Sequence, residues 1–228
     1  MGIMRKLVLT FMLVISATAV AQDFFATRQL SLKRDGSARG VSWSAEVEYP
    51  TAGPAEALKG VREWLAEELE VVSPPADGNA LLKIAADSFL VHANGRRTIR
   101  VERTYEDEHC VTFQSWVTDT DEETWKAADC ASFDKHDGHR ITIQEIFNCS
   151  DEQLQQLMWQ YKGDLQLDVE SADQLIAVNA GFTDGWVIVI GPAHHQTGAE
   201  FRMRYMRVLP YLHTTYSGYY GGEDEEDE

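Results

Sequence analysis

The chain has 228 residues, 44% of them hydrophobic, with six tryptophans and a formal net charge of −17 from 20 Lys and Arg against 37 Asp and Glu. The apolar fraction excludes a chain that is disordered throughout and predicts a folded globule. The negative charge repels phosphates, so we expect no nucleic acid among the partners.

The first 21 residues have the pattern of a signal peptide. Arg5 and Lys6 precede the apolar run 7–20, and Ala19-Val20-Ala21 offers small residues to a signal peptidase. The run is shorter than the ~20 residues of a membrane-spanning helix, and no basic cluster follows it. We expect cleavage after Ala21, export to the periplasm or beyond the cell, and no transmembrane segment after cleavage. The mature chain would carry 18 basic against 37 acidic residues, a net charge of −19. An uncleaved N-terminal anchor is the alternative.

Two strands and two helices are predicted next. Residues 25–33 and 41–49 alternate in strand fashion, with turn residues Asp35-Gly36 between them. Pro54 suits the first turn of a helix over residues 54–70. Five apolar residues of that helix have the 3/4 spacing of a buried stripe: Leu58, Val61, Trp64, Leu65 and Leu69. After Pro74-Pro75, residues 79–92 read as a second helix.

Strands dominate the rest of the chain. Alternation predicts strands at residues 98–105, 109–117 and 125–133, and later at 186–190 and 200–209. Between them, Ser150 begins a capping box that starts a third helix. The predicted order is β-β-α-α-β-β-β-α-β-β: an α+β fold with a largely antiparallel sheet and three helices, not a βαβ crossover fold.

We expect a signal peptide at 1–21 and a single α+β domain at 22–216, made of an N-terminal part (22–95) and a second part (96–216). Residues 217–228 end in six consecutive acids and are expected to be a disordered acidic tail.

The sequence offers few candidate catalytic or metal-ligating residues. His194-His195 follows Gly191-Pro192 in a predicted loop, and adjacent histidines on an extended chain point to opposite sides. Four residues around a turn have the types of metal ligands, but turn chemistry accounts for them as well: Asp134, His136, Asp137 and His139. No glycine-rich elbow or phosphate loop is present. We therefore assign no catalytic, cofactor-binding or metal residue, and no cofactor.

The three cysteines match no zinc pattern. The strands at 109–117 and 125–133 are expected to form a hairpin around residues 119–122. Residues that face each other across a hairpin have a roughly constant sum of residue numbers. For Cys110 and Cys130 the sum is 240, which centres the hairpin on Thr120, so the two cysteines should face each other. We expect these two to form a disulfide in an oxidising compartment and to leave Cys149 free. Three reduced, packed cysteines are the alternative.

One stretch resembles the RsiV-like family of exported bacterial domains, over about residues 98–212. The resemblance rests on a series of short motifs in order: Tyr105-Glu106-Asp107, Val111-Thr112-Phe113, Phe133-Asp134, residues 138–147, Phe182-Thr183-Asp184-Gly185 and Leu209-Pro210-Tyr211-Leu212. The sequence departs from the family at residues 125–130 and 191–195, where the family has Gly-Gly-Ala-His and Tyr-x-x-Tyr-Glu-Ile segments.

The resemblance implies an exported binding domain. Some members are the outer domains of anti-sigma factors that bind lysozyme, and others accompany polysaccharide deacetylases. We expect a non-enzymatic domain that binds a macromolecule or cell-envelope component, and the net charge favours a cationic protein as partner. The alternative is a peptidoglycan-acting enzyme or an accessory domain of a polysaccharide deacetylase.

Overall fold

The computed structural model describes residues 24–37, 40–92, 95–119, 126–163, 165, 167, 169–193 and 196–215. The expected signal peptide, His194-His195, the hairpin tip at 120–125 and the acidic tail lie outside these residues. None of the helices in the described part is long and apolar enough to cross a membrane.

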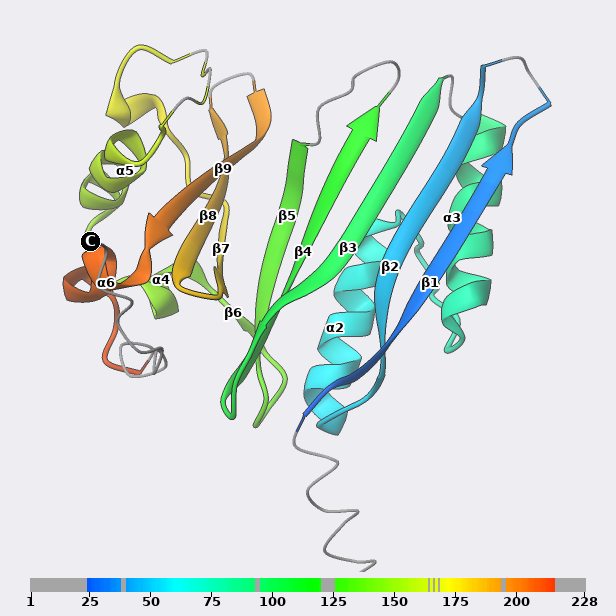
Figure 1. The fold of residues 1–228 in the computed structure, drawn as a ribbon, viewed down its shortest axis with the longest axis horizontal. Helices are drawn as coiled ribbons and strands as arrows, with labels where there is room; N and C mark the ends of the chain where they lie inside the picture. The colour runs from blue at the N-terminus through cyan, green and yellow to red at the C-terminus, as the bar shows by residue number, and fades with distance from the viewer. Residues whose placement is uncertain are drawn as a thin grey trace, which may run out of the picture.

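The fold is built from two sheets (Figure 1). The large sheet has six strands in chain order: β1 (Ala26–Asp35), β2 (Ser42–Ala52), β3 (Arg96–Glu106), β4 (Cys110–Asp119), β5 (Lys126–Asp134) and β6 (Arg140–Ile141). The small sheet has three: β7 (Asn179–Thr183), β8 (Trp186–Ala193) and β9 (Gln196–Arg204). All neighbouring strands are antiparallel except β2 and β3.

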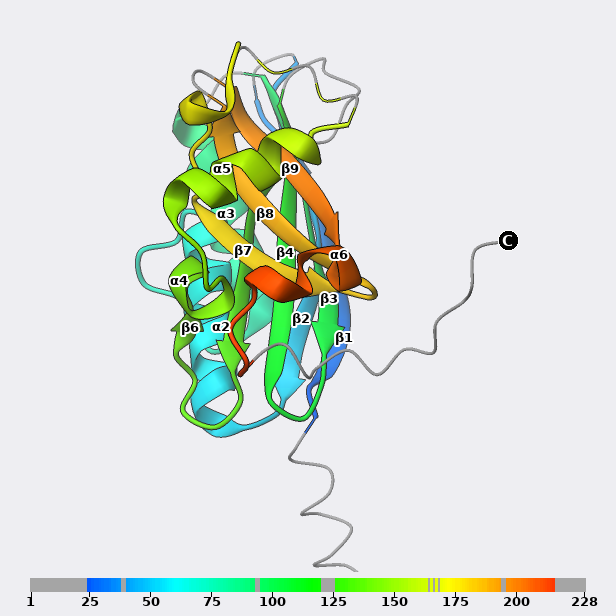
Figure 2. The same cartoon turned by 90° about the vertical axis from the view of Figure 1, so that its left-hand side faces the viewer.

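The helices flank the sheets on opposite sides. Helices α2 (Ala55–Glu68) and α3 (Gly78–His92) lie behind the large sheet in Figure 1, and α5 (Asp151–Gln160) covers the outer face of the small sheet in Figure 2. Shorter elements complete the small-sheet side: α4 (Ile143–Ile146), α6 (Tyr205–Val208) and the 3-10 turns at Ala172–Gln174 and Leu209–Tyr211. The order of layers is helices, large sheet, small sheet, helix.

Each interface between layers has its own apolar core. The predicted α2 stripe packs on the large sheet, with Val61, Trp64 and Leu65 at most 2% exposed. This core also contains Phe113 and Phe133, so it draws on both predicted parts of the domain. A second core joins α5 to the small sheet. A small apolar cluster lies between the sheets: Trp116, Cys130, Ile188 and Ile190.

The α+β class and the largely antiparallel sheets agree with the prediction, but three details are wrong. Five α-helices, not three, occur among the described residues, because residues 140–147 form β6 and α4, and α6 follows β9. Strand β7 is absent from the predicted order. The exclusion of a crossover is also wrong: β2 and β3 pair in parallel, and α2 and α3 form the connection between them.

Candidate functional site

A hollow of about 830 Å³ lies at the end of the large sheet where β1 begins and where β3 meets β4. Four connecting segments line it, and the lining residues are Phe24, Gly53, Pro54, Ala55, Glu108, His109, Asp134, Lys135 and His136. It therefore joins the start of the described chain, the β2–α2 loop, the β3–β4 hairpin and the β5–β6 turn. Of the sequence candidates, Asp134 and His136 line the hollow directly.

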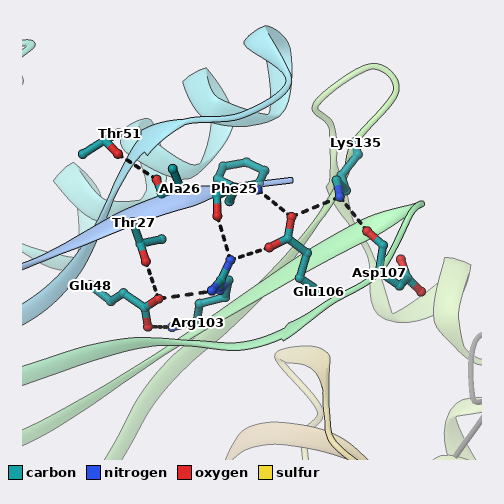
Figure 3. A network of polar contacts seen from close by, with 9 residues as sticks. All are labelled: Phe25, Ala26, Thr27, Glu48, Thr51, Arg103, Glu106, Asp107 and Lys135. Carbon is teal, nitrogen blue, oxygen red and sulfur yellow. Dashed lines mark hydrogen bonds and ion pairs between the residues drawn. The ribbon is translucent and has the colours of Figure 1, made fainter. Parts of the chain in front are cut away.

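A buried ion pair holds two of these segments together (Figure 3). Lys135 Nζ lies 3.0 Å from Glu106 Oε1 and donates to the backbone carbonyl of Asp107 at 2.6 Å. The Lys135 and Glu106 side chains are only 4% and 8% exposed, respectively. Phe24 covers the ammonium group, with its ring centroid 4.2 Å from Nζ. The lysine charge is thus neutralised by a buried partner.

The same carboxylate fixes the beginning of β1. The backbone N–H of Phe25 donates to Glu106 Oε1 at 2.7 Å, and Arg103 donates to the Phe25 carbonyl at 2.9 Å and to Glu106. Glu48 of β2 accepts from the Arg103 backbone N–H at 3.0 Å and from Thr27 at 2.6 Å. The network joins β1, β2, β3 and the β5–β6 turn, as Figure 3 shows.

The β5–β6 turn is packed tightly against α2. Gly138 has φ +78°, and a Cβ at this position would lie 2.3 Å from the backbone carbon of Glu56. Asp134 Oδ1 accepts from the His136 backbone N–H at 2.7 Å, which confirms the predicted turn chemistry. The Lys135 backbone N–H donates to the His109 carbonyl at 2.7 Å. The wall of the hollow is therefore fixed by backbone contacts.

His139 lies beside the hollow between two carboxylates. Its Nδ1 is 2.5 Å from Asp137 and its Nε2 is 3.0 Å from Glu145. The bond to Asp137 is the main cause that raises the pKa of His139, since both carboxylates favour the protonated ring. The pKa of Asp137 is lowered, first by the His139 backbone N–H, and the pKa of Glu145 is lowered, first by the Thr142 backbone N–H.

Asp134, Asp137 and His139 also offer ligand atoms within 4.8 Å of one another. A carboxylate and imidazole set is chemically suited to a divalent transition metal. A metal at His139 would need one ring nitrogen to leave its present carboxylate partner, and the ring would have to lose its proton.

The charge of the hollow follows from this geometry. Glu108 of the lining is 80% exposed and lies 3.0 Å from His109 Nε2. Two further exposed acids adjoin the lining in sequence: Glu56, and Asp137, which is bound to His139. Among the described residues of the lining, Lys135 is neutralised by Glu106, and the other ionisable nitrogen groups belong to histidines. Phe24 of the same lining is 53% exposed, so the hollow offers carboxylates and part of an aromatic ring to a cationic group with an apolar stem, such as a lysine or arginine side chain.

A second polar cluster is buried between α2 and the large sheet. Asp129 accepts from Trp64 Nε1 at 2.9 Å and from Arg140 at 2.6 Å, and it also accepts from Asn179 of β7. Ser115 donates to Glu68, the last residue of α2. Burial is the main cause that raises the pKa of Glu68 to about 7. This cluster connects three layers of the fold.

The cysteine prediction needs correction. The β4–β5 hairpin forms as expected, but Cys110 is opposite Asp134 and Cys130 is opposite Gln114. The two cysteines are thus four positions apart along the hairpin, about 13 Å at the usual rise per residue, too far for a disulfide. All three cysteines are free in the structure. Burial raises the pKa of Cys110 and Cys130, which keeps both as thiols.

Sequence reasoning missed several residues of the hollow as site residues: Phe24, Glu108, His109 and Lys135. The Tyr105-Glu106-Asp107 motif was the sequence feature that pointed to these residues. Glu106 binds Lys135. Asp107 Oδ1 accepts from the His109 and Cys110 backbone N–H groups at 2.8 and 2.7 Å. The burial of Lys135 could not be read from a pattern, because it lies in a turn of polar residues. His194 and His195 lie outside the described residues.

Comparisons with known proteins bear on the fold. No family model and no curated protein matches the chain. Among solved structures, a member of the DUF3298 family from Bacteroides fragilis matches 84% of this chain and 94% of its own, with a TM-score of 0.51 and 10% identity. A DUF3298 family protein from Pseudomonas aeruginosa matches 85% of this chain and 96% of its own, with a TM-score of 0.46 and 14% identity. The chain thus shares the fold of the Bacteroides structure, whose family name denotes a domain of unknown function.

Proposed function

We propose that this chain is an exported bacterial binding domain of the RsiV-like type, without enzymatic activity of its own, that binds a cationic protein at the acidic hollow. The observation that carries the proposal is the charge arrangement there. The exposed Glu108 and the half-buried Asp134 share the lining with the Phe24 ring, while Lys135 of the lining is buried against Glu106.

Further support comes from rigidity and net charge. The walls are held by the Lys135–Glu106 pair and by backbone contacts of the β5–β6 turn, so the backbone that carries the acids is fixed. Preorganised walls reduce the entropy lost on binding. The whole chain carries −17, which steers a cationic partner toward it at low ionic strength.

The test is calorimetric titration of the protein with a lysozyme as the cationic probe, using the chain without residues 1–21. We expect binding that weakens as salt rises from about 10 to 150 mM, because the screening length shortens from ~30 Å to ~8 Å. The double variant Glu56→Gln/Glu108→Gln should bind several-fold more weakly, in keeping with ~0.2–1 kcal/mol for each exposed charge.

A matched control separates the hollow from overall charge. Glu63→Gln/Glu67→Gln removes the same two charges from exposed positions further along α2. We expect this variant to bind as the wild type does, apart from a small change in salt dependence. Equal weakening by both double variants, or binding that is indifferent to salt, would show that the hollow is not the site.

The alternative function, a peptidoglycan-acting enzyme or deacetylase accessory, is favoured by one observation: the ligand atoms of Asp134, Asp137 and His139 lie within 4.8 Å of one another. An enzyme of this kind would use a bound metal to activate water. Metal analysis of purified protein decides between the two. One zinc per chain that disappears in His139→Gln would favour the enzyme, whereas binding of the cationic probe by metal-free protein favours the binding domain.

A further inference from the structure

The last turn of α2 carries an unusual concentration of negative charge. Glu67, Glu68 and Glu70 lie at or just beyond its C-terminus, and the last turn has no basic residue. Since the C-terminal end of a helix carries a partial negative charge, acids here are unfavourable when ionised. Glu70 is compensated by a cation, Arg97 at 2.7 Å.

The end of the helix is held by a set of backbone bonds. Val71 N–H donates to the Ala66 carbonyl at 2.8 Å and Glu70 N–H to the Glu67 carbonyl at 2.9 Å, the pattern of a Schellman motif. Glu70 takes the left-handed position with φ +57°, which favours glycine. A residue with a side chain is strained at this position, so the motif depends on the contacts around it.

Glu68 provides a polar contact between this turn and the sheet. Its carboxyl accepts from the hydroxyl of Ser115 on β4, and Ser115 is 1% exposed. The Ser115 hydroxyl in turn accepts from the Asp129 backbone N–H at 3.1 Å. The polar groups that act on Glu68 come from three elements besides β4: Glu67 on α2, Asp129 on β5 and Arg140 on β6.

A small cavity adjoins the end of α2. It has a volume of about 20 Å³, room for one water molecule, and Glu68, Glu70, Ser88 and Arg97 contribute its polar lining. Helix α3 contributes no charged residue to this lining, and β3 contributes Arg97.

We propose that Glu68 is a proton-operated latch: as the neutral acid it closes the last turn of α2 onto Ser115, and as the carboxylate it releases that turn from the sheet. Ionisation adds a charge to the negative end of the helix, beside Asp129 and Glu67, in a site where burial disfavours the charged form. These costs outweigh the stronger hydrogen bond that a carboxylate accepts from Ser115. Arg140, the cation facing the site, is already bound to Asp129 at 2.6 Å. The raised pKa of Glu68, about 7, sets the switching range near neutral pH.

Hydrogen exchange of the Leu69, Glu70 and Val71 amides tests the latch between pH values of about 5.5 and 8.5, after correction for the intrinsic rate. We expect their protection to fall by about tenfold or more as the pH rises, because each unit of pKa shift corresponds to a tenfold change in the equilibrium. Glu68→Gln keeps the hydrogen-bond acceptor without the charge, so its protection should not depend on pH. Glu63→Gln removes an exposed charge of α2 that is not among the charges acting on Glu68, and it should behave as the wild type does.

Protection that still depends on pH in Glu68→Gln, or protection in the wild type that does not change with pH, would overturn the proposal. If Glu68→Gln does not fold, the carboxyl carbon of Glu68 in the wild type gives the answer by NMR titration. A midpoint near 7 supports the latch, and a midpoint near the ordinary glutamate value of 4.5 overturns it.

Discussion

Lys135 Nζ lies 3.0 Å from Glu106 Oε1, and both side chains are almost completely removed from solvent although one lies at the end of a strand and the other in a turn. Glu106 ends β3 and Lys135 follows β5, so this one contact closes two walls of the hollow. The pair has a structural role that turn composition alone would not suggest.

Lys135→Met should therefore destabilise the protein by about 3 kcal/mol, because Glu106 would remain buried with fewer partners. Arg103 and the Phe25 N–H still bind Glu106, which limits the loss. Urea unfolding measures the effect. Lys59→Met is the control: its ion pair with Glu63 is exposed and 4.0 Å long, so we expect a change below about 0.5 kcal/mol. Equal effects of the two substitutions would contradict a buried pair.

Gly138 tests how closely the β5–β6 turn is packed. Gly138→Ala should cost about 3 kcal/mol or more, because a positive φ strains alanine and its Cβ would collide with the Glu56 backbone. Gly40 has a similar φ of +85°, but nothing lies within 4 Å of where its Cβ would be, so Gly40→Ala should cost only about 1 kcal/mol. Thermal unfolding of the two variants measures both losses of stability. Equal losses for Gly138→Ala and Gly40→Ala would show that the β5–β6 turn is not packed against α2.

The raised pKa of Glu68 should make the folded protein less stable as the pH rises. Its pKa is raised from 4.5 to about 7 in the folded protein, so the folded state holds the proton more strongly than the unfolded state does. The free energy of unfolding should fall as pH rises from 4.5 to 7, by up to about 3 kcal/mol, with the full loss present above pH 7. Glu68→Gln should remove this fall in urea unfolding series. A wild-type stability that rises through this range relative to the variant would contradict the assignment.

The thiol count follows from the corrected register of β4 and β5. Cys110 and Cys130 are four positions apart along the hairpin, and Cys149 precedes α5, so we expect three free thiols per chain under denaturing, non-reducing conditions. Thiol titration with a chromogenic disulfide measures this number. One free thiol would show that a disulfide forms in the protein after all.

The predictions from sequence succeed where one periodicity governs a segment. The stripe of α2 is predictable because Val61, Trp64, Leu65 and Leu69 pack on one apolar face, and each is at most 3% exposed. Ser150 and Gln153 form the predicted capping box, which depends only on local geometry. These elements need little information from distant parts of the chain.

The failures come from contacts between distant segments. Strand β7 has five residues and contains Gly181. A Cβ at this position would lie 2.7 Å from the Thr112 side chain, so the close packing of the two sheets excludes the β-branched or aromatic residue that would have marked a strand in the sequence. Facing residues of β4 and β5 near the cysteines have numbers that sum to 244, as in Cys110 and Asp134, rather than the expected 240. The register change between Ser115 and Trp116 accounts for only one residue of this difference. At the hollow, Asp134 and His136 could be named as candidates, but the burial of Lys135 depends on Glu106, 29 residues away.

The central claim is that a cationic protein binds at the acidic hollow, and a hydrogen-exchange footprint of the complex with a lysozyme tests it most directly. We expect slower exchange at residues 107–110 and 134–137, which line or adjoin the hollow, with the outer face of α5 unchanged. The same footprint should weaken at about 150 mM salt. Protection confined to α5 or to the outer face of the small sheet, with none at these two turns, would contradict the claim.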